Sequence, residues 1–409
     1  MTTPLDVPAP VFATVSATLS ASLSAPLSAH SPTDDAQGPA SLAPGNQTLL
    51  IVNADAAYYA AQLMEALAQP GTDAASPDAT AVTAVPDATA VPTVPAPVLP
   101  VARPPATSTA PVARPPATVT VLAATPGQPL PEGAEAATAV MGFASALTPA
   151  LITQLPHLRW LHALSSGVDG IVSLPNLPAG LVMTSSHGVH GPAVSELTLM
   201  LMLSLARDFP SLIDNQRAHL WKRRPQPLLH GKTVVILGTG LIARALATRC
   251  RALGMRTVAV TATVRDLPEF DTVLARSDLL DGAAQADMLV ALAPLDDTTK
   301  GMVDASVFAA MKPTACFINV ARAGLCDTAA LVDALTGGRL AGAALDVFER
   351  EPLPADDPLW DVPRLLITPH LGGESDRYAD QVLPIIVHNT RCALQGRWDA
   401  MRNRIALPA

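Results

Sequence analysis

Residues 231–252 read GKTVVILGTGLIARALATRCRA, and this stretch decides the fold that the sequence predicts. The run TVVIL has the composition of a buried strand, and LIARALATRCRA repeats apolar side chains at helical spacing. Between the two runs, Gly238 and Gly240 stand at a tight turn. A strand, a glycine turn and a helix in this order are typical of an α/β domain with a parallel sheet.

The same alternation of strand and helix continues on both sides of this stretch. Strand-like runs recur downstream as RTVAVTA, DMLVALAP, ACFINVA, GAALDVF and LLITPH, most with helical patterns between them. Upstream, the apolar run at 48–54 and the helical pattern AAYYAAQLMEALAQ begin another α/β domain. The sequence therefore predicts an α/β protein of two Rossmann-like domains, each with a doubly wound parallel sheet.

Two low-complexity segments interrupt this pattern. Residues 1–46 are rich in Ala, Ser, Thr and Pro, and residues 71–117 carry PVARPPAT at 100–107 and again from 111. Both lack apolar periodicity, so we expect a disordered tail and a disordered insertion. We predict a first domain at 47–187, completed by a C-terminal helix within 371–409, and a dinucleotide-binding domain at 188–370. The apolar helix at 195–209 would connect them.

Composition and charge exclude several classes of partner. The chain has 409 residues, 49% of them apolar, and a formal net charge of -9, which disfavours binding to nucleic acid and to anionic membranes. Its four cysteines are widely spaced, and its N-terminus has neither a basic n-region nor an apolar h-region. No apolar run reaches the roughly 18 residues that a membrane-spanning helix needs. We therefore expect a soluble, cytoplasmic protein.

The glycine turn has the pattern of a dinucleotide site. Gly238 permits the tight turn, Gly240 lets the backbone approach a pyrophosphate, and Ala243 replaces the third glycine where the helix packs on the strand. Leu241 and Ile242 open the helix, whose N-terminal N–H groups and dipole favour phosphate. The alternative is a strand-to-helix turn without a ligand.

The end of the following strand favours NADP over NAD. An NAD site would place an acid about 20 residues after the glycines, but Thr261 stands there. Without that carboxylate a 2′-phosphate is not repelled, and Arg265 is placed to pair with it. In the alternative, Asp266 or a backbone group serves NAD and Arg265 is only solvated.

Several motifs resemble the D-isomer-specific 2-hydroxyacid dehydrogenase family, in particular its glyoxylate/hydroxypyruvate reductases. Besides the glycine turn they are SSGVD at 165–169, APLDDTTKG at 293–301, NVARAGLCD at 319–327, AALDVFEREP at 343–352 and LLITPHLGG at 365–373. The resemblance implies an oxidoreductase that transfers a hydride between NAD(P)H and a small 2-keto acid to give a D-2-hydroxy acid. It also implies an active-site cleft between the domains, no metal, and a homodimer, for which the connector helix is a candidate surface.

The same resemblance assigns three catalytic residues. Arg322 would hold the substrate carboxylate and polarise its carbonyl oxygen, since its planar fork suits both. His370 would act as the general acid in reduction. Glu351 would stabilise the protonated imidazole, although a solvated loop acid is the alternative. His157, His162, His187 and His190 lack the T-P-H-x-G-G setting of His370.

Further residues match family positions around the ligands. Ser166 and Gly167 would bind the substrate carboxylate through backbone N–H groups. Asp346 could orient the nicotinamide amide. The remaining positions that would line the cofactor are Pro294, Thr299, Val320, Ala321, Gly372 and Gly373.

Other functions and substrates stay open at this point. A formate dehydrogenase is disfavoured, because that subgroup has glutamine where Glu351 stands. A dinucleotide-sensing corepressor on the same fold is the alternative from a different class, since fold alone does not decide function. Glyoxylate and hydroxypyruvate are favoured as substrates because SSGVD adds no charge for a phosphate, while pyruvate or a branched keto acid is not excluded.

Overall fold

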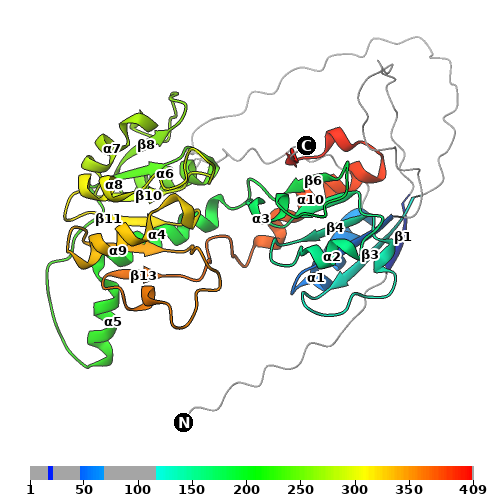
Figure 1. Ribbon diagram of the computed structural model, residues 1–409, viewed down its shortest axis with the longest axis horizontal. Coiled ribbons are helices and arrows are strands. Elements are labelled where there is room, and N and C mark those ends of the chain that lie inside the picture. The colour runs from blue at the N-terminus through cyan, green and yellow to red at the C-terminus, as the bar shows by residue number, and fades with distance from the viewer. Residues whose placement is uncertain (1–16, 22–46, 69–116, 408–409) are drawn as a thin grey trace, which may run out of the picture. The chain divides into compact units, whose positions relative to one another are not determined.

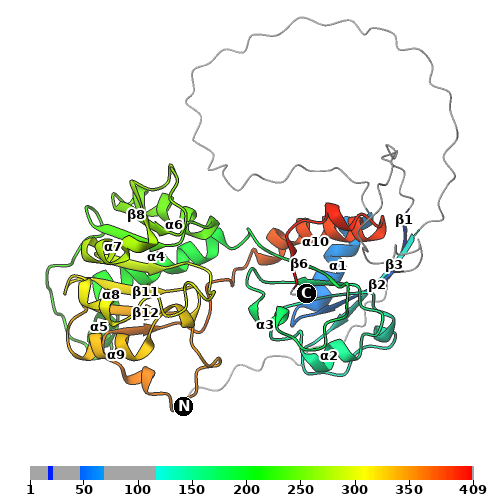
Figure 2. The same cartoon turned by 45° about the horizontal axis from the view of Figure 1, so that its top comes forward.

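The computed structural model describes residues 17–21, 47–68 and 117–407 of the chain (Figure 1). The chain divides into unit 1, which comprises Met1–Ser186 and Leu383–Ala409, and unit 2, which comprises His187–Val382. Within the described residues, each unit contains one seven-stranded sheet, and Figure 2 shows both units from a second angle. We predicted that the chain would return to the first domain at residue 371, yet residues 371–382 belong to unit 2. One reason is that Tyr378 packs its ring on that of His190, with 5.4 Å between centroids.

All seven strands of unit 2 run parallel, in the order β13-β12-β11-β10-β7-β8-β9. This confirms the predicted doubly wound parallel sheet. The strands are β7 (Thr233–Leu237), β8 (Arg256–Thr261), β9 (Thr272–Ala275), β10 (Met288–Ala291), β11 (Cys316–Asn319), β12 (Gly342–Leu345) and β13 (Leu365–Ile367).

Helices cover both faces of this sheet, which explains why its strands carry apolar side chains on both sides. Val235 and Leu237 of β7 join one buried apolar cluster, whereas Val234 and Ile236 join another. The second cluster includes residues of α4 (Gly191–Arg207) and α6 (Leu241–Ala252), and the first includes residues of α7 (Leu279–Gln285), α8 (Ala305–Ala310) and α9 (Thr328–Thr336).

The helix α4 begins four residues before the predicted connector helix. Pro192 is tolerated there because the first turn of a helix has no internal acceptor for its N–H groups. The helix ends at Arg207, because Asp208 takes a left-handed backbone with φ +47°. The chain then continues directly into α5 (Phe209–Arg217), which has no buried residue. Figure 1 shows α5 extending away from the sheet of unit 2.

The sheet of unit 1 has the order β1-β3-β2-β4-β5-β6-β14, with antiparallel strands at both edges. The strands are β1 (Ala17–Ala21), β2 (Gln47–Val52), β3 (Ala117–Ala124), β4 (Ala139–Gly142), β5 (Trp160–Ala163), β6 (Val182–Ser185) and β14 (Arg404–Ile405). β1 departs from the expected tail, because the open edge of β3 offers backbone groups with which a passing segment can pair. The rest of the tail, and residues 71–116 of the insertion, lie outside the described residues.

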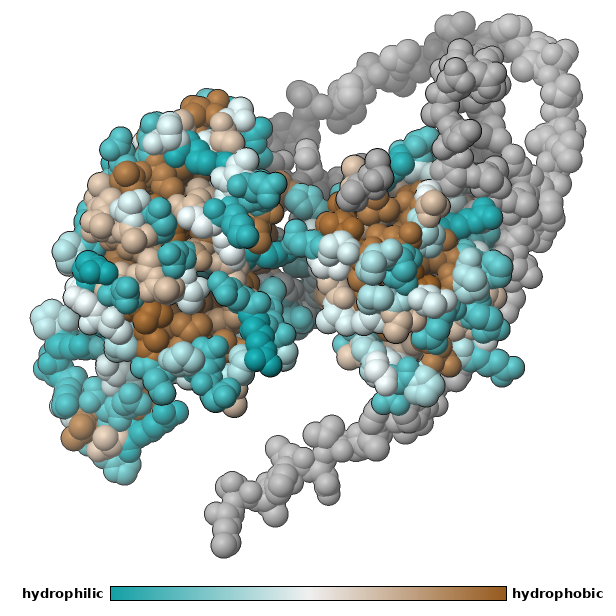
Figure 3. All heavy atoms as spheres, viewed as in Figure 1, coloured by the Kyte–Doolittle hydropathy of each residue, from teal (hydrophilic) through white to brown (hydrophobic). Residues whose placement is uncertain are grey.

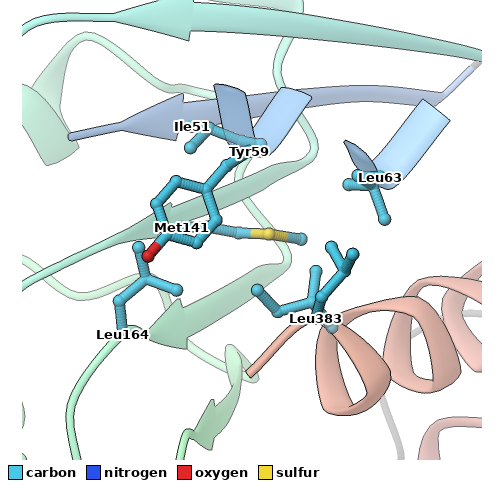
Figure 4. Close-up of a pocket in the computed structure, with 7 residues that line it drawn as sticks. Ile51, Tyr59, Leu63, Met141, Leu164 and Leu383 are labelled. Carbon is cyan, nitrogen blue, oxygen red and sulfur yellow. The ribbon is translucent and has the colours of Figure 1, made fainter. Parts of the chain in front are cut away.

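Helices also cover both faces of the sheet in unit 1. A small apolar pocket marks where α1 (Ala56–Ala68) and α10 (Tyr378–Leu394) meet the strands. Its side chains converge from the helices and the sheet, as Figure 4 shows for Tyr59, Met141 and Leu383. Residues of α2 (Pro149–Thr153) and α3 (Asp169–Val172) join a separate apolar cluster with the strands.

Short 3-10 turns complete the described secondary structure. They are η1 (Ala134–Ala136), η2 (Arg276–Asp278), η3 (Ala323–Leu325), η4 (Pro358–Asp361) and η5 (Trp398–Ala400). Among the described helices, none combines the length and apolarity needed to cross a membrane. On the face in view in Figure 3, hydrophobic and hydrophilic side chains are interspersed over both units.

A buried histidine in unit 1 hydrogen-bonds to a hydroxyl group through each of its ring nitrogens. His162 is fully buried, with Nδ1 2.7 Å from Thr184 Oγ1 and Nε2 3.1 Å from Ser186 Oγ. The indole N–H of Trp160 donates to the same Thr184 oxygen (2.9 Å), so the Thr184 hydroxyl proton is available to His162 Nδ1. Burial lowers the pKa of His162 from its ordinary 6.5 to about 3.

We predict that His162 makes the stability of unit 1 depend on pH. The unfolded histidine takes up a proton near pH 6.5, whereas the folded one does so only near pH 3. Its contribution is therefore complete above 6.5 and is lost as the pH falls toward 3, with a limiting slope of about 1.4 kcal/mol per pH unit. Urea unfolding at a series of pH values should show this slope in the free energy of unfolding. His162→Gln should lower the slope by the amount that corresponds to one bound proton. His157→Gln, at an exposed position, is the control. Equal slopes for wild type and His162→Gln would contradict the prediction.

Candidate active site

The predicted site residues of unit 2 lie where its strands end, along the line of their carboxyl ends, which we call the sheet edge. Because the strands are parallel, the loops that follow them leave from the same edge. Gly238 follows β7, Arg322 lies three residues after β11, Asp346 follows β12, and His370 lies three residues after β13. Parallel pairing thus gathers residues that are up to 132 positions apart in the sequence.

Glu351 and His370 form a hydrogen-bonded pair. His370 Nδ1 lies 2.7 Å from Glu351 Oε2, and because a carboxylate only accepts, Nδ1 carries the proton. The other carboxylate oxygen accepts the backbone N–H of Phe348 (2.9 Å), which fixes the Glu351 side chain. The His370 side chain is 49% exposed and that of Glu351 is 35% exposed. The ring is therefore oriented by a carboxylate and still accessible, which is the arrangement that proton transfer requires.

Arg322 lies between β11 and the short turn η3. Its backbone is extended, and its Nη1 donates to the carbonyl of Ala321 (2.7 Å). The side chain is half-buried. Arg322 follows β11, and His370 follows β13, which is two strands away in the sheet. A planar guanidinium there can bind a carboxylate with two parallel hydrogen bonds.

The glycine turn has the geometry that a pyrophosphate needs. Gly238 has φ +108°, and a Cβ there would lie 2.9 Å from the carbonyl oxygen of Leu292. Gly240 caps α6 with no side-chain hydrogen bond to the helix, and a Cβ there would meet no atom within 4 Å. The space beside Gly240, at the N-terminus of α6, is therefore open. These residues fit the phosphates of a dinucleotide.

A threonine in the glycine turn lies beside a threonine at the end of the next strand, β8. Thr261 is the last residue of β8, and its Oγ1 lies 3.3 Å from that of Thr239. Arg265 and Asp266 are both exposed in the loop that follows. The nearby carboxylate of Glu269 accepts two hydrogen bonds from Arg244 (2.6 and 2.9 Å), and the Arg244 guanidinium lowers the pKa of Glu269.

Among the residues expected to line a cofactor, Thr299 also stabilises a loop at the sheet edge. The hydroxyl of Thr299, which is fully buried, donates to the carbonyl of Pro294 (2.7 Å) and accepts the N–H of Asp296 (2.8 Å). A Cβ on Gly373 would lie 3.2 Å from the ring of His190. The other predicted positions are Val320, which is buried, Ala321, Leu241 and Ile242, which are half-buried, and Gly372, which is buried.

The SSGVD loop belongs to unit 1, where it follows β5. The Ser165 hydroxyl donates to the carbonyl of Gly167 (2.7 Å), and the N–H of Ser186 donates to the carbonyl of Ser165 (3.2 Å). The backbone around Ser166 and Gly167 is thus held from both sides. Over the described ranges, we find no group of three or more His, Cys, Asp or Glu residues that could bind a metal ion.

Sequence reasoning missed two polar residues at this edge. Asn319 is 1% exposed and contacts the backbone around Arg322, while Thr368 donates to Asp346 (2.6 Å). The available signal was a polar residue at the end of an apolar strand, where a buried side chain needs a hydrogen-bond partner.

The fold and the site define the chain as a protein with a doubly wound dinucleotide-binding domain and a Glu–His pair at its sheet edge. The family model described as D-isomer specific 2-hydroxyacid dehydrogenase, NAD binding domain, matches residues 199–372. A glyoxylate/hydroxypyruvate reductase B from Salmonella gallinarum is 31% identical over 267 residues, which cover 64% of this chain and 82% of that protein.

A second relative by sequence and a solved structure are also similar to this chain. A D-3-phosphoglycerate dehydrogenase from Mycobacterium bovis is 30% identical over 266 residues, but the match covers only 50% of its length and 64% of this chain. The crystal structure of a D-isomer specific 2-hydroxyacid dehydrogenase family protein from Aeromonas salmonicida has a TM-score of 0.71 and 28% identity, with 88% of this chain and 99% of that chain covered. The chain therefore belongs to the D-isomer specific 2-hydroxyacid dehydrogenase family.

Exchanging the two glycines for alanine should separate a structural role from an open position. Gly238→Ala places a Cβ against the Leu292 carbonyl at a positive φ, so we expect a loss of about 1–3 kcal/mol in the free energy of unfolding. Gly240→Ala has φ -69° and open space, so it should change stability by less than about 0.5 kcal/mol. Urea unfolding of both variants measures this difference, and equal losses would refute the assignment.

Proposed function

We propose that the chain is an oxidoreductase that interconverts a small 2-keto acid and a D-2-hydroxy acid with a nicotinamide dinucleotide. The observation that carries this proposal is the 2.7 Å hydrogen bond between His370 Nδ1 and Glu351 Oε2 in a half-exposed setting. An imidazole held in this way can exchange a proton with a substrate oxygen. When bound, the dinucleotide supplies or accepts the hydride.

Arg322 is the proposed anchor of the substrate. A 2-keto acid has a carboxylate beside its carbonyl, and a guanidinium fork can bind one group while polarising the other. As negative charge develops on the carbonyl oxygen, a fixed cation stabilises it without reorganisation. Backbone N–H groups of Ser166 and Gly167, in the loop after β5, are proposed as further donors to the carboxylate.

His370 is the proposed acid in reduction and base in oxidation. Nδ1 is engaged with Glu351, so Nε2 is the nitrogen that would give a proton to the developing alkoxide. In the reverse direction Nε2 takes the hydroxyl proton, and Glu351 stabilises the imidazolium that forms. The Phe348 N–H holds the Glu351 carboxylate in place throughout (2.9 Å).

The dinucleotide would bind along the sheet edge of unit 2, and we favour NADP over NAD. Gly238, Gly240, Leu241 and Ile242 would surround the phosphates. Thr261 leaves the end of β8 without a carboxylate, and Arg265 is exposed and able to pair with a 2′-phosphate. The other proposed contacts are Pro294, Thr299, Val320, Ala321, Asp346, Gly372 and Gly373.

Glyoxylate and hydroxypyruvate are the proposed substrates. Support comes from the glyoxylate/hydroxypyruvate reductase that is 31% identical to this chain. The absence of a charged side chain other than Asp169 in SSGVD is in keeping with a substrate that lacks a phosphate group.

Dinucleotide oxidation at 340 nm against a panel of 2-keto acids tests the proposed function. We expect turnover with glyoxylate or hydroxypyruvate, faster with NADPH than with NADH, and a fall of about 10²–10⁴-fold in kcat for His370→Ala. Glu351→Gln should lower kcat as well, and His157→Ala, at an exposed position of unit 1, should not. Measurable dinucleotide binding without turnover of any keto acid would instead favour a dinucleotide-sensing protein.

We also propose that the chain forms a homodimer through α4 and α5. Met200 and Leu203 of α4 are 49% and 42% exposed, and Phe209 of α5 is 50% exposed. An isolated helix of nine residues is marginal in water, and α5 has no buried residue of its own. A second copy packed on these apolar side chains would supply the missing contacts.

Sedimentation velocity tests the dimer. Leu203→Glu should shift the protein from dimer to monomer, because a charge cannot be buried in an apolar interface without a partner. Leu280→Glu introduces the same charge at a 47% exposed position of α7 and should leave the dimer intact. A wild-type protein that sediments as a monomer, or a Leu203→Glu variant that remains dimeric, would exclude this interface.

A further inference from the structure

Asp346 is buried at the end of β12, and the loop that carries His370 donates to its carboxylate three times. Oδ1 accepts the Thr368 hydroxyl (2.6 Å) and the Leu371 N–H (2.9 Å), and Oδ2 accepts the Gly372 N–H (2.9 Å). The Asp346 residue is 1% exposed. These donors flank His370 on both sides, so the carboxylate holds the loop before and after it.

The backbone of His370 needs such support. Its φ is +52°, in the left-handed region, which costs a residue with a side chain about 1–2 kcal/mol. Charge-assisted hydrogen bonds to a buried carboxylate are strong enough to offset that cost. A Cβ on Gly372 would lie 3.0 Å from Asp346 Oδ2, so glycine permits the close approach of the loop.

Asn319 holds the backbone around Arg322 by hydrogen bonds, as Asp346 holds the backbone around His370. Its Oδ1 accepts the Ala321 N–H (3.1 Å), and its Nδ2 donates to the Arg322 carbonyl (2.9 Å). Asn319 is 1% exposed, so its amide is committed to this loop. The backbone then joins the two clamps, because the Asp346 N–H donates to the Asn319 carbonyl (3.0 Å).

We propose that Asn319, Asp346 and Thr368 are positioning residues that fix the backbones of Arg322 and His370 as one polar unit. They act through the loops and need not touch the reacting atoms. The inference rests on the proposed function for its effect on turnover, but the loop clamp is a property of the protein without ligand. A misplacement of about 1 Å at a reacting group can lower turnover on the order of 100-fold.

The matched pair Thr368→Val and Thr368→Ser tests the proposal. Valine replaces the hydroxyl with a methyl group, whereas serine loses the methyl group and keeps the donor to Asp346. In the ligand-free protein, we expect hydrogen exchange at the Leu371 and Gly372 amides to accelerate about 10-fold in Thr368→Val and to stay near the wild-type rate in Thr368→Ser. Turnover should fall about 10–100-fold in the valine variant alone, with the dinucleotide Kd changed by less than about 2-fold.

Two further variants keep the test decisive. Asn319→Asp removes the Nδ2 donor to Arg322 and should lower kcat with little change in the dinucleotide Kd. Thr336→Val removes an exposed hydroxyl on α9, which bonds within its own helix, and should leave exchange and kcat unchanged. Equal behaviour of the two Thr368 variants would overturn the proposal.

The outcomes also separate this inference from the proposed function. If exchange at Leu371 and Gly372 keeps the wild-type rate in Asp346→Asn, the clamp is refuted, whatever this variant does to dinucleotide binding. If wild type turns over no keto acid, the proposed function fails. In that case, the exchange rates of the Thr368 pair still decide whether the clamp exists.

Discussion

Parallel hydrogen bonding between the strands of unit 2 brings the loops of its candidate site to the same end of the sheet. Neighbouring strands pair in register, as Val235 does with Val258 and Ile318 does with Ala344. Their carboxyl ends therefore fall along a common edge, and each following loop starts there. The same arrangement needs return helices on both faces, which is why β7 is apolar on both sides.

That edge has a cost, because loops that leave a buried sheet carry polar groups into a region with little water. An unsatisfied buried donor or acceptor costs about 1–3 kcal/mol. Asn319, Asp346 and Thr299 meet this demand by bonding to loop backbone, so each polar side chain also restricts a loop. The same hydrogen bonds thus satisfy the buried polar groups and fix the geometry of the site. A substitution that removes one of these bonds therefore affects both.

Local patterns in the sequence predicted the parts of the structure that local forces determine. The strand, turn and helix at 231–252 were expected from apolar periodicity and two glycines, and β7 and α6 lie there. β14 has only two residues and is defined by its pairing with Met183 and Thr184, so periodicity has nothing to detect. β1 likewise depends on the edge of β3, which the sequence of residues 17–21 does not reveal. The hydrogen bonds of Asn319 and Thr368 escaped prediction because their partners are set by neighbouring strands and by loop conformation.

Environment distinguishes the histidines on physical grounds that are independent of any motif. Each ring nitrogen of His162 hydrogen-bonds to a hydroxyl group, and burial lowers its pKa to about 3, so near pH 7 the ring lacks the imidazolium proton that a general acid gives up. Burial, aided by His187, lowers the pKa of His190 to about 4, with the same consequence. His370 differs from both because it is half-exposed and donates Nδ1–H to a carboxylate that is itself held by a backbone N–H. Of these three rings, His370 alone is both half-exposed and hydrogen-bonded to a carboxylate, which makes it the candidate for proton transfer even without the T-P-H-x-G-G pattern.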